Sequence, residues 1–212
     1  MHPLLSELSL YDHIIWDWNG TLLGDLGHNV RTMNALLDSA SLPQITIDDH
    51  RKYFKFPVVD YYKILGFDTS PDSFVLLCEE FNSKYNEGIA NCELSPGIRD
   101  VLLHLKAENK TQSILSASKQ DALENAVKHF ELSDVFQYVF GIEDNMASSK
   151  FERGKQLMEL SHIPCVTTAL VGDTTHDLEV GNALGIDVIL VDHGHQSIER
   201  LLTAHDRVIH CF

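Results

Sequence analysis

Short apolar runs alternate with helical stretches from Gly97 to the end of this 212-residue chain. An earlier apolar run, at residues 13–17, has the same character. Strands that are separated by helices pair in parallel, so the alternation predicts an α/β, Rossmann-like parallel sheet core with helices on both faces. The expected strands are 13–17, 112–116, 135–140, 168–171, 188–191 and 207–210, and the expected core helices are 97–107, 120–130, 151–161, 177–184 and 197–204.

The segment from Asp25 to Leu94 interrupts this alternation. It contains four helical stretches, at 29–39, 47–53, 58–65 and 71–86, and no convincing strand. Ser95-Pro96-Gly97 has the composition of a hinge into the next core helix. We therefore expect a core made of residues 1–24 and 95–212, and an inserted, small α-helical cap made of residues 25–94.

Composition excludes several partners and locations. The net charge is −15, so a polyanion such as nucleic acid is not attracted to this protein. The four cysteines form no CxxC pair, which argues against a structural zinc site or a disulfide scaffold and favours the reducing cytoplasm. The first residues include Glu7 and Asp12 and resemble neither a signal peptide nor a membrane span. We take a monomer as the default, with a homodimer through the cap as the alternative.

Chemically useful side chains follow the predicted strands. Asp17 ends the first strand, and Ser116 ends the second. Asp173 and Asp177 follow the fourth strand, and Lys150 opens the helix before it. Ligands of open parallel sheets bind at the carboxyl ends of the strands, so we expect these groups to converge.

This set suits phosphoryl transfer. Asp17 and Asp173 could share a Mg²⁺ ion, which prefers carboxylates, water and substrate oxygens. Ser116 and Lys150 could hold the phosphate oxygens, and a carboxylate could attack phosphorus to form an aspartyl-phosphate. Each residue alone has a simpler explanation, as a helix cap, a turn hydroxyl or a surface lysine; the combination and its order carry the hypothesis.

Four motifs in this order resemble the haloacid dehalogenase superfamily, of the phosphoglycolate-phosphatase-like kind with a helical C1-type cap. Residues 17–22, Asp-Trp-Asn-Gly-Thr-Leu, resemble the first motif, DxDGTL. Residues 114–116 resemble the second motif, and Lys150 fits the third. Residues 170–177 match the fourth motif, hhGDxxxD, and residues 194–197 resemble a glycine-led loop near the family's C-terminus.

The resemblance implies a Mg²⁺-dependent phosphatase that acts on a small phosphorylated metabolite. Asp17 would be the nucleophile and a metal ligand, and Asn19 would offer its backbone carbonyl to the metal. Asp173 and Asp177 would complete the metal site. The residues expected to bind substrate are Thr21, Ser116, Ala117, Lys150 and, from the cap, Lys55.

Asn19 departs from the family pattern, which has a second aspartate at this position as the general acid and base. An amide can donate a hydrogen bond, but it cannot give up a proton as an acid or take one as a base at neutral pH. One hypothesis is an active enzyme that favours activated phosphates or borrows an acid such as His28. The alternative is a catalytically weakened protein that binds a phosphorylated metabolite or has a regulatory function.

The cap is expected to select the substrate. Residues 50–57 form a basic, aromatic stretch in which Arg51 or Lys55 could face a second anionic group, or could simply be solvated. We expect His176 to point to solvent and the pair His193 and His195 to be incidental. Cap residues such as Met33, Tyr61 and Phe74 are expected in its core.

Overall fold

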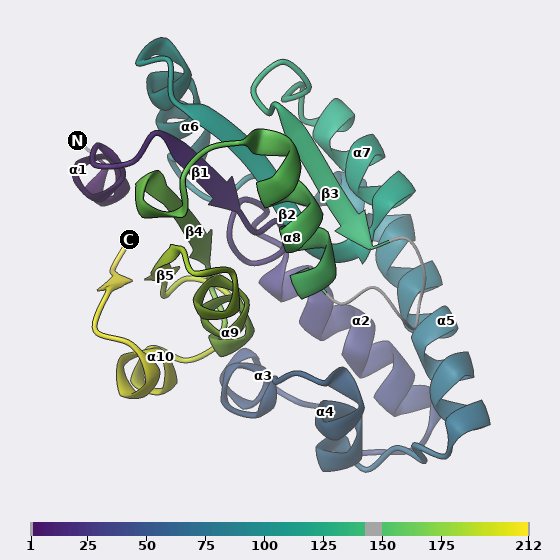
Figure 1. Ribbon diagram of the computed structural model, residues 1–212. Helices are drawn as coiled ribbons and strands as arrows, with labels where there is room; N and C mark the ends of the chain where they lie inside the picture. The colour runs from purple at the N-terminus through teal and green to yellow at the C-terminus, as the bar shows by residue number, and fades with distance from the viewer. Residues whose placement is uncertain (1, 143–149, 212) are drawn as a thin grey trace.

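A six-stranded sheet, parallel at every pairing, forms the centre of the computed structural model, which describes residues 2–142 and 150–211. The strand order is β3-β2-β1-β4-β5-β6, so the chain begins in the middle of the sheet and extends it first to one side and then to the other (Figure 1). The strands are β1 (His13–Trp16), β2 (Thr111–Lys119), β3 (Tyr138–Ile142), β4 (Thr168–Gly172), β5 (Asp187–Val191) and β6 (Val208–Ile209).

Helices cover both faces because alternate residues of the buried strands point to opposite sides. Ile14 and Trp16 pack in one hydrophobic cluster with α1 (Pro3–Leu8), α6 (Ile98–Ala107) and α7 (Gln120–His129). Ile15 packs in a second cluster with α8 (Lys150–Ser161) and α9 (Thr175–Leu184). A third, smaller cluster joins Leu201 of α10 (Ile198–Ala204) to β5. The predicted α/β class is confirmed.

The inserted segment is helical, as expected. Its α-helices are α2 (Leu26–Ser39), α3 (Ile47–Tyr53), α4 (Val58–Leu65) and α5 (Pro71–Gly88), and a 3₁₀ turn, Ile89–Asn91, follows α5. Another 3₁₀ turn, Cys165–Thr167, precedes β4 in the core. The four helices share a core of their own that includes Met33, Leu37 and Tyr61. Figure 1 shows them beyond the arrowheads of the strands, so they cover the edge at which ligands bind.

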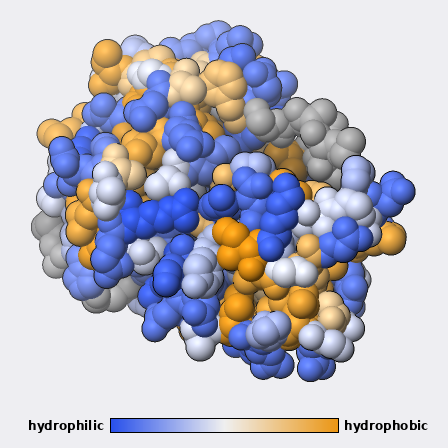
Figure 2. All heavy atoms as spheres, turned by 90° about the horizontal axis from the view of Figure 1, so that it is seen from below, coloured by the Kyte–Doolittle hydropathy of each residue, from blue (hydrophilic) through white to orange (hydrophobic). Residues whose placement is uncertain are grey.

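Figure 2 views the molecule from the side on which α3 and α4 lie and shows a mainly hydrophilic surface, with hydrophobic residues gathered most clearly at the lower right of the view and others near its top. No helix in residues 2–142 and 150–211 is long and apolar enough to cross a bilayer. The boundaries 1–24, 95–212 and 25–94 remain a prediction, and residues 1, 143–149 and 212 lie outside the described part of these ranges.

Two local features differ from expectation. The third strand begins at Tyr138 rather than Val135, because Val135 and Phe136 lie in a turn and bury their side chains against α7 and its neighbours. The helix α1 was not expected from the sequence. The His2 side chain caps the N-terminus of α1 by accepting a hydrogen bond from the Leu4 N–H, and Leu4 and Leu8 bury one face of the helix.

His13 should make stability depend on pH. Burial lowers its pKa to about 4, Nε2 bonds the Ser113 hydroxyl, and Nδ1 has no partner among the described residues. In the unfolded chain His13 binds a proton near pH 6.5, whereas in the folded chain it stays neutral down to about pH 4. The free energy of unfolding therefore falls as the pH drops below 6.5. Between pH 7 and pH 5 we expect His13→Gln to lose about 2 kcal/mol less unfolding free energy than the unmodified protein in urea titrations. Equal losses in both proteins would contradict this assignment.

Candidate active site

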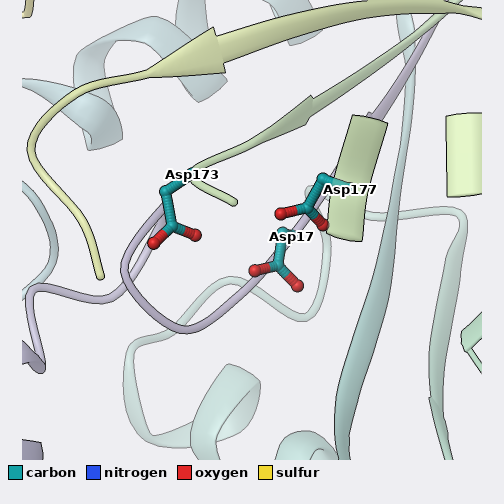
Figure 3. A group of neighbouring side chains, drawn as sticks. All are labelled: Asp17, Asp173 and Asp177. Atoms are coloured by element: carbon teal, nitrogen blue, oxygen red, sulfur yellow. The ribbon is translucent and has the colours of Figure 1, made fainter. Parts of the chain in front are cut away.

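Three buried aspartates meet at the carboxyl edge of the sheet. Asp17 follows β1 and its backbone N–H donates to the Val171 carbonyl of β4 at 2.8 Å. Asp173 follows β4, and Asp177 lies in the first turn of α9. One carboxylate oxygen from each lies within 4.8 Å of the others, and Figure 3 shows the three side chains grouped together. The predicted convergence at this edge therefore holds for the acids.

Close backbone packing makes room for these carboxylates. Gly20 has a φ of +72°, and a Cβ there would collide with the Asp173 carboxylate and the His195 ring. A Cβ at Gly194 would also collide with Asp173. Both loops therefore need glycine where they close over Asp173, because a side chain at either position would collide with its carboxylate. At Gly20 the positive φ favours glycine as well.

Lys150 bridges two of the acids. Its ammonium lies 2.5 Å from Asp17 Oδ1 and 2.5 Å from Asp177 Oδ1, and only 4 % of the residue is exposed. The other Asp177 oxygen accepts from the backbone N–H and hydroxyl of Thr174, which completes a capping box at the start of α9. Lys150 is therefore held by the acid cluster and is not a surface lysine.

Charge at this site is unbalanced. Burial raises the pKa of Asp17 to about 8, although Lys150 opposes the shift, and burial raises the pKa of Asp173 to about 6 against the charge of His195. Burial alone would also raise the pKa of Asp177, but Lys150 outweighs it and lowers that pKa. Burial alone would lower the pKa of Lys150, which the two neighbouring carboxylates instead raise. One ammonium thus does not compensate three carboxylates.

The donor set fits a hard divalent cation. Each acid offers a carboxylate oxygen, the ligand that Mg²⁺ prefers, and an added positive charge would lower the raised pKa of Asp17 and keep it ionised. His195 supports the cluster from outside: its backbone N–H donates to Asp173 Oδ2 at 2.6 Å, while the Thr21 hydroxyl donates to Oδ1 at 3.0 Å. The His193–His195 pair is therefore structural, and neither histidine belongs to the acidic group.

A cavity of about 370 Å³ opens from the acids toward the cap. Ser116 and Ala117 line it at the end of β2, together with Asp17, Asn19 and Lys150. Thr21 lies behind Asp173 and is absent from the lining. The structure thus brings together most of the predicted substrate residues and leaves Thr21 as a support for an acid.

The predicted cations of the cap do not reach this cavity. Lys55 lies 3.8 Å from Asp60 in a half-exposed ion pair and is not among the lining residues. Arg51 donates to the carbonyls of His193 and Gly194 at 2.9 and 3.0 Å, which fastens α3 to the core. The expectation for His176 was wrong: it is half-buried, lines the cavity and stacks on Phe56 at 4.5 Å between ring centroids.

The Asn19 amide is fully engaged. Its nitrogen donates to Asp25 Oδ2 at 3.1 Å and to the Tyr85 hydroxyl at 2.7 Å, and its oxygen accepts from the Ser118 hydroxyl at 2.6 Å. Tyr85 in turn donates to Asp25 at 2.7 Å, and the backbone N–H of Gly20 donates to Asp25 at the same distance. The network requires a donor at position 19, and an aspartate cannot supply one when ionised.

Asp25 was missed by sequence reasoning, and so were its partners Tyr85 and His195. Burial alone would raise the pKa of Asp25, but His195 and the hydrogen bonds lower it to about 2. Burial alone would lower the pKa of His195, but Asp25, 3.3 Å away, raises it to about 9. His195 also contacts His50, at 3.0 Å. The one sequence signal was an acid directly after the first-motif loop; its partners are distant in the chain.

Replacing Asn19 by aspartate should destabilise the protein. The new carboxylate would face the buried, ionised Asp25 and remove a donor, so we expect a loss of about 1–3 kcal/mol in unfolding free energy at pH 7 without metal. The control is Asn91→Asp, at an exposed position, for which a change within about 0.5 kcal/mol is expected. Urea titrations that give Asn19→Asp the stability of the control would show that the network does not need an amide.

Comparison with known proteins agrees with this geometry. The family model described as "Haloacid dehalogenase-like hydrolase" matches residues 14–191. "Probable phosphatase IndB" of Dickeya dadantii is 24% identical over 92% of this chain and 87% of its own, and a "Phosphoglycolate phosphatase" of Synechococcus elongatus is 23% identical over 90% and 88%. A haloacid dehalogenase-like hydrolase structure from Streptococcus pneumoniae superposes with a TM-score of 0.81 at 20% identity, over 95% of each chain. With its family match across the central sheet, this chain belongs to the haloacid dehalogenase-like hydrolases.

Proposed function

We propose that this protein is a Mg²⁺-dependent phosphatase that hydrolyses a small phosphorylated metabolite through an aspartyl-phosphate on Asp17. The supporting observation is the position of Asp17, which lines the cavity while sharing Lys150 with Asp177. The names of the phosphatase relatives agree with this reaction class.

Asp17, Asp173, Asp177 and the Asn19 backbone carbonyl would hold the ion, which would neutralise the acids and the incoming phosphate. Lys150 and the Ser116 hydroxyl would stabilise charge on the non-bridging phosphate oxygens. A carboxylate oxygen of Asp17 bonds to phosphorus as the bond from phosphorus to the leaving oxygen breaks. Water then attacks phosphorus, which releases inorganic phosphate and restores the Asp17 carboxylate.

Protonation of the leaving group is the weak step. The Asn19 amide has no acidic proton to transfer at neutral pH, and its contacts with Asp25, Tyr85 and Ser118 hold it in place. His28 does not replace it, because its Nε2 bonds the Tyr85 carbonyl at 2.7 Å and the residue is not among those lining the cavity. General acid catalysis is worth about 10²–10⁴-fold, so turnover should depend strongly on the leaving group.

Asp17→Asn should abolish turnover. We expect phosphate release from 4-nitrophenyl phosphate with Mg²⁺ to fall by at least about 10³-fold. The matched control is Asp12→Asn, at an exposed position just before β1, which should retain activity. Acid-quenched unmodified protein should carry one phosphoryl group that hydroxylamine removes. Persistent release by Asp17→Asn would refute the nucleophile, whereas Mg²⁺-dependent ligand binding without release by the unmodified protein would favour a binding or regulatory protein.

Metal binding can be tested without turnover. Mg²⁺ at about 100 times its dissociation constant should stabilise the folded protein by about 2.7 kcal/mol, measured as a rise in Tm. Asp173→Asn removes one ligand charge and should lose most of that rise, while Asp12→Asn should keep it. An equal Tm rise in Asp173→Asn would exclude this carboxylate as a ligand.

A further inference from the structure

The cap side of the cavity is aromatic and apolar. Phe54 and Phe56 enter it from the segment after α3, and Phe81 and Tyr85 from one face of α5, while the core adds Trp18 from the loop after β1. Phe81 and Tyr85 stack with ring centroids 5.8 Å apart. Ring surfaces of this kind favour a flat apolar group and gain free energy by excluding water from it.

The polar groups that α2 and α5 contribute to the cavity wall include neutral amides. Asn82 and Asn86 of α5 and Asn29 of α2 line the cavity and offer amides. The cations among the described lining residues are Lys150, which the acids hold, His195, which Asp25 holds, and Lys119, which is exposed at the end of β2. A second carboxylate or phosphate on the substrate that faced α5 would therefore lie against rings and amides, which do not compensate its desolvation.

The size of the cavity agrees with a compact ligand. Its volume of about 370 Å³ is at the lower end of the range of about 300–1,000 Å³ for small-molecule sites. The phosphoryl group would occupy the polar end, near Asp17 and Ser116. One aromatic ring with small substituents would fill the apolar end.

The amide at position 19 independently favours an aromatic leaving group. A phenol has a pKa of about 10, as in tyrosine, so its oxide leaves phosphorus without prior protonation. An alkyl alcohol is a far poorer leaving group and needs the acid that Asn19 cannot provide.

We propose that the natural substrate is a small aryl phosphate monoester whose aromatic leaving group carries no charge. The proposal rests on the proposed phosphatase function. An Asp17 oxygen bonds to phosphorus, the bond between phosphorus and the aryl oxygen breaks, and the aryl oxide leaves with the electron pair and takes its proton from solvent. Water then hydrolyses the aspartyl-phosphate.

Four substrates distinguish the effect of the aromatic ring on kcat/KM from the effect of the leaving group. Phenyl phosphate has both the ring and the good leaving group, benzyl phosphate has the ring with an alkoxide, acetyl phosphate has a good leaving group without a ring, and phosphoglycolate has neither and adds a carboxylate. We expect kcat/KM for phenyl phosphate to exceed that for acetyl phosphate by roughly 10–100-fold because of ring burial. It should exceed that for benzyl phosphate by about 10²-fold or more because of the missing acid.

Two cap variants test the wall itself. Phe56→Ala should lower kcat/KM for phenyl phosphate about 10-fold more than for acetyl phosphate. Asn86→Lys puts a cation on the cavity wall and should raise the ratio of phosphoglycolate to phenyl phosphate turnover about 10-fold, whereas Asn91→Lys, exposed and not among the lining residues, should leave it unchanged.

The outcomes are distinguishable. Phosphoglycolate or acetyl phosphate turned over as well as phenyl phosphate would overturn the aryl assignment and leave the phosphatase intact. No Mg²⁺-dependent release from any of the four substrates would overturn both. A preference for phenyl phosphate that Phe56→Ala does not reduce would show that leaving-group chemistry alone sets it, and would overturn the aromatic binding wall.

Discussion

Repulsion among three buried carboxylates is the constraint on which the rest of this structure depends. Asp17, Asp173 and Asp177 each place an oxygen within 4.8 Å of the others at almost no exposure to solvent. Such a group persists only with donors and cations around it. Lys150 bridges two of the acids, and the His195 backbone and the Thr21 hydroxyl hold the third. Much of the core's loop structure therefore serves to position one cluster of negative charge.

The amide at Asn19 connects that cluster to the cap. It lies two residues after Asp17, yet its partners are Asp25 at the start of the insertion, Tyr85 on α5 and Ser118 near the end of β2. A family aspartate at this position would transfer protons, whereas the amide ties three separate segments together. The loss of an acid is therefore accompanied by a contact that an acid could not make, because Asp25 is already ionised beside it.

The sequence allowed the sheet and the acid cluster to be predicted because both depend on local pattern. Apolar runs mark buried strands, and parallel strands bring their carboxyl ends to one edge, so Asp17 and Asp173 could be placed together. The third strand was placed three residues early, because buried turn residues such as Val135 have the same apolar character as a strand.

Tertiary contacts were beyond the reach of pattern. Tyr85 and His195 meet Asp25 only after the cap has folded onto the core, and no spacing in the chain records that meeting. Lys55 was expected at the substrate because it is basic and lies in the cap, yet it forms an ion pair with Asp60 in the first turn of α4. The charge of a side chain indicates which kind of ligand it can bind, but the neighbouring residues decide whether the side chain is available for that ligand.

The two ends of the cavity come from different parts of the chain, and this division shapes what the site can select. Asp17, Ser116 and Lys150 belong to the core, while Phe56 and Phe81 belong to the insertion. Under the proposed function, substitutions in the cap would therefore change the leaving group that is accepted without disturbing the acids. Asn19 lies at the boundary, lining the cavity while its amide is bonded to Tyr85 of the cap. The chemistry that a leaving group needs and the surface that it contacts are thus linked through one side chain, so a cap suited to charged alkyl phosphates would have to accompany a different residue at position 19.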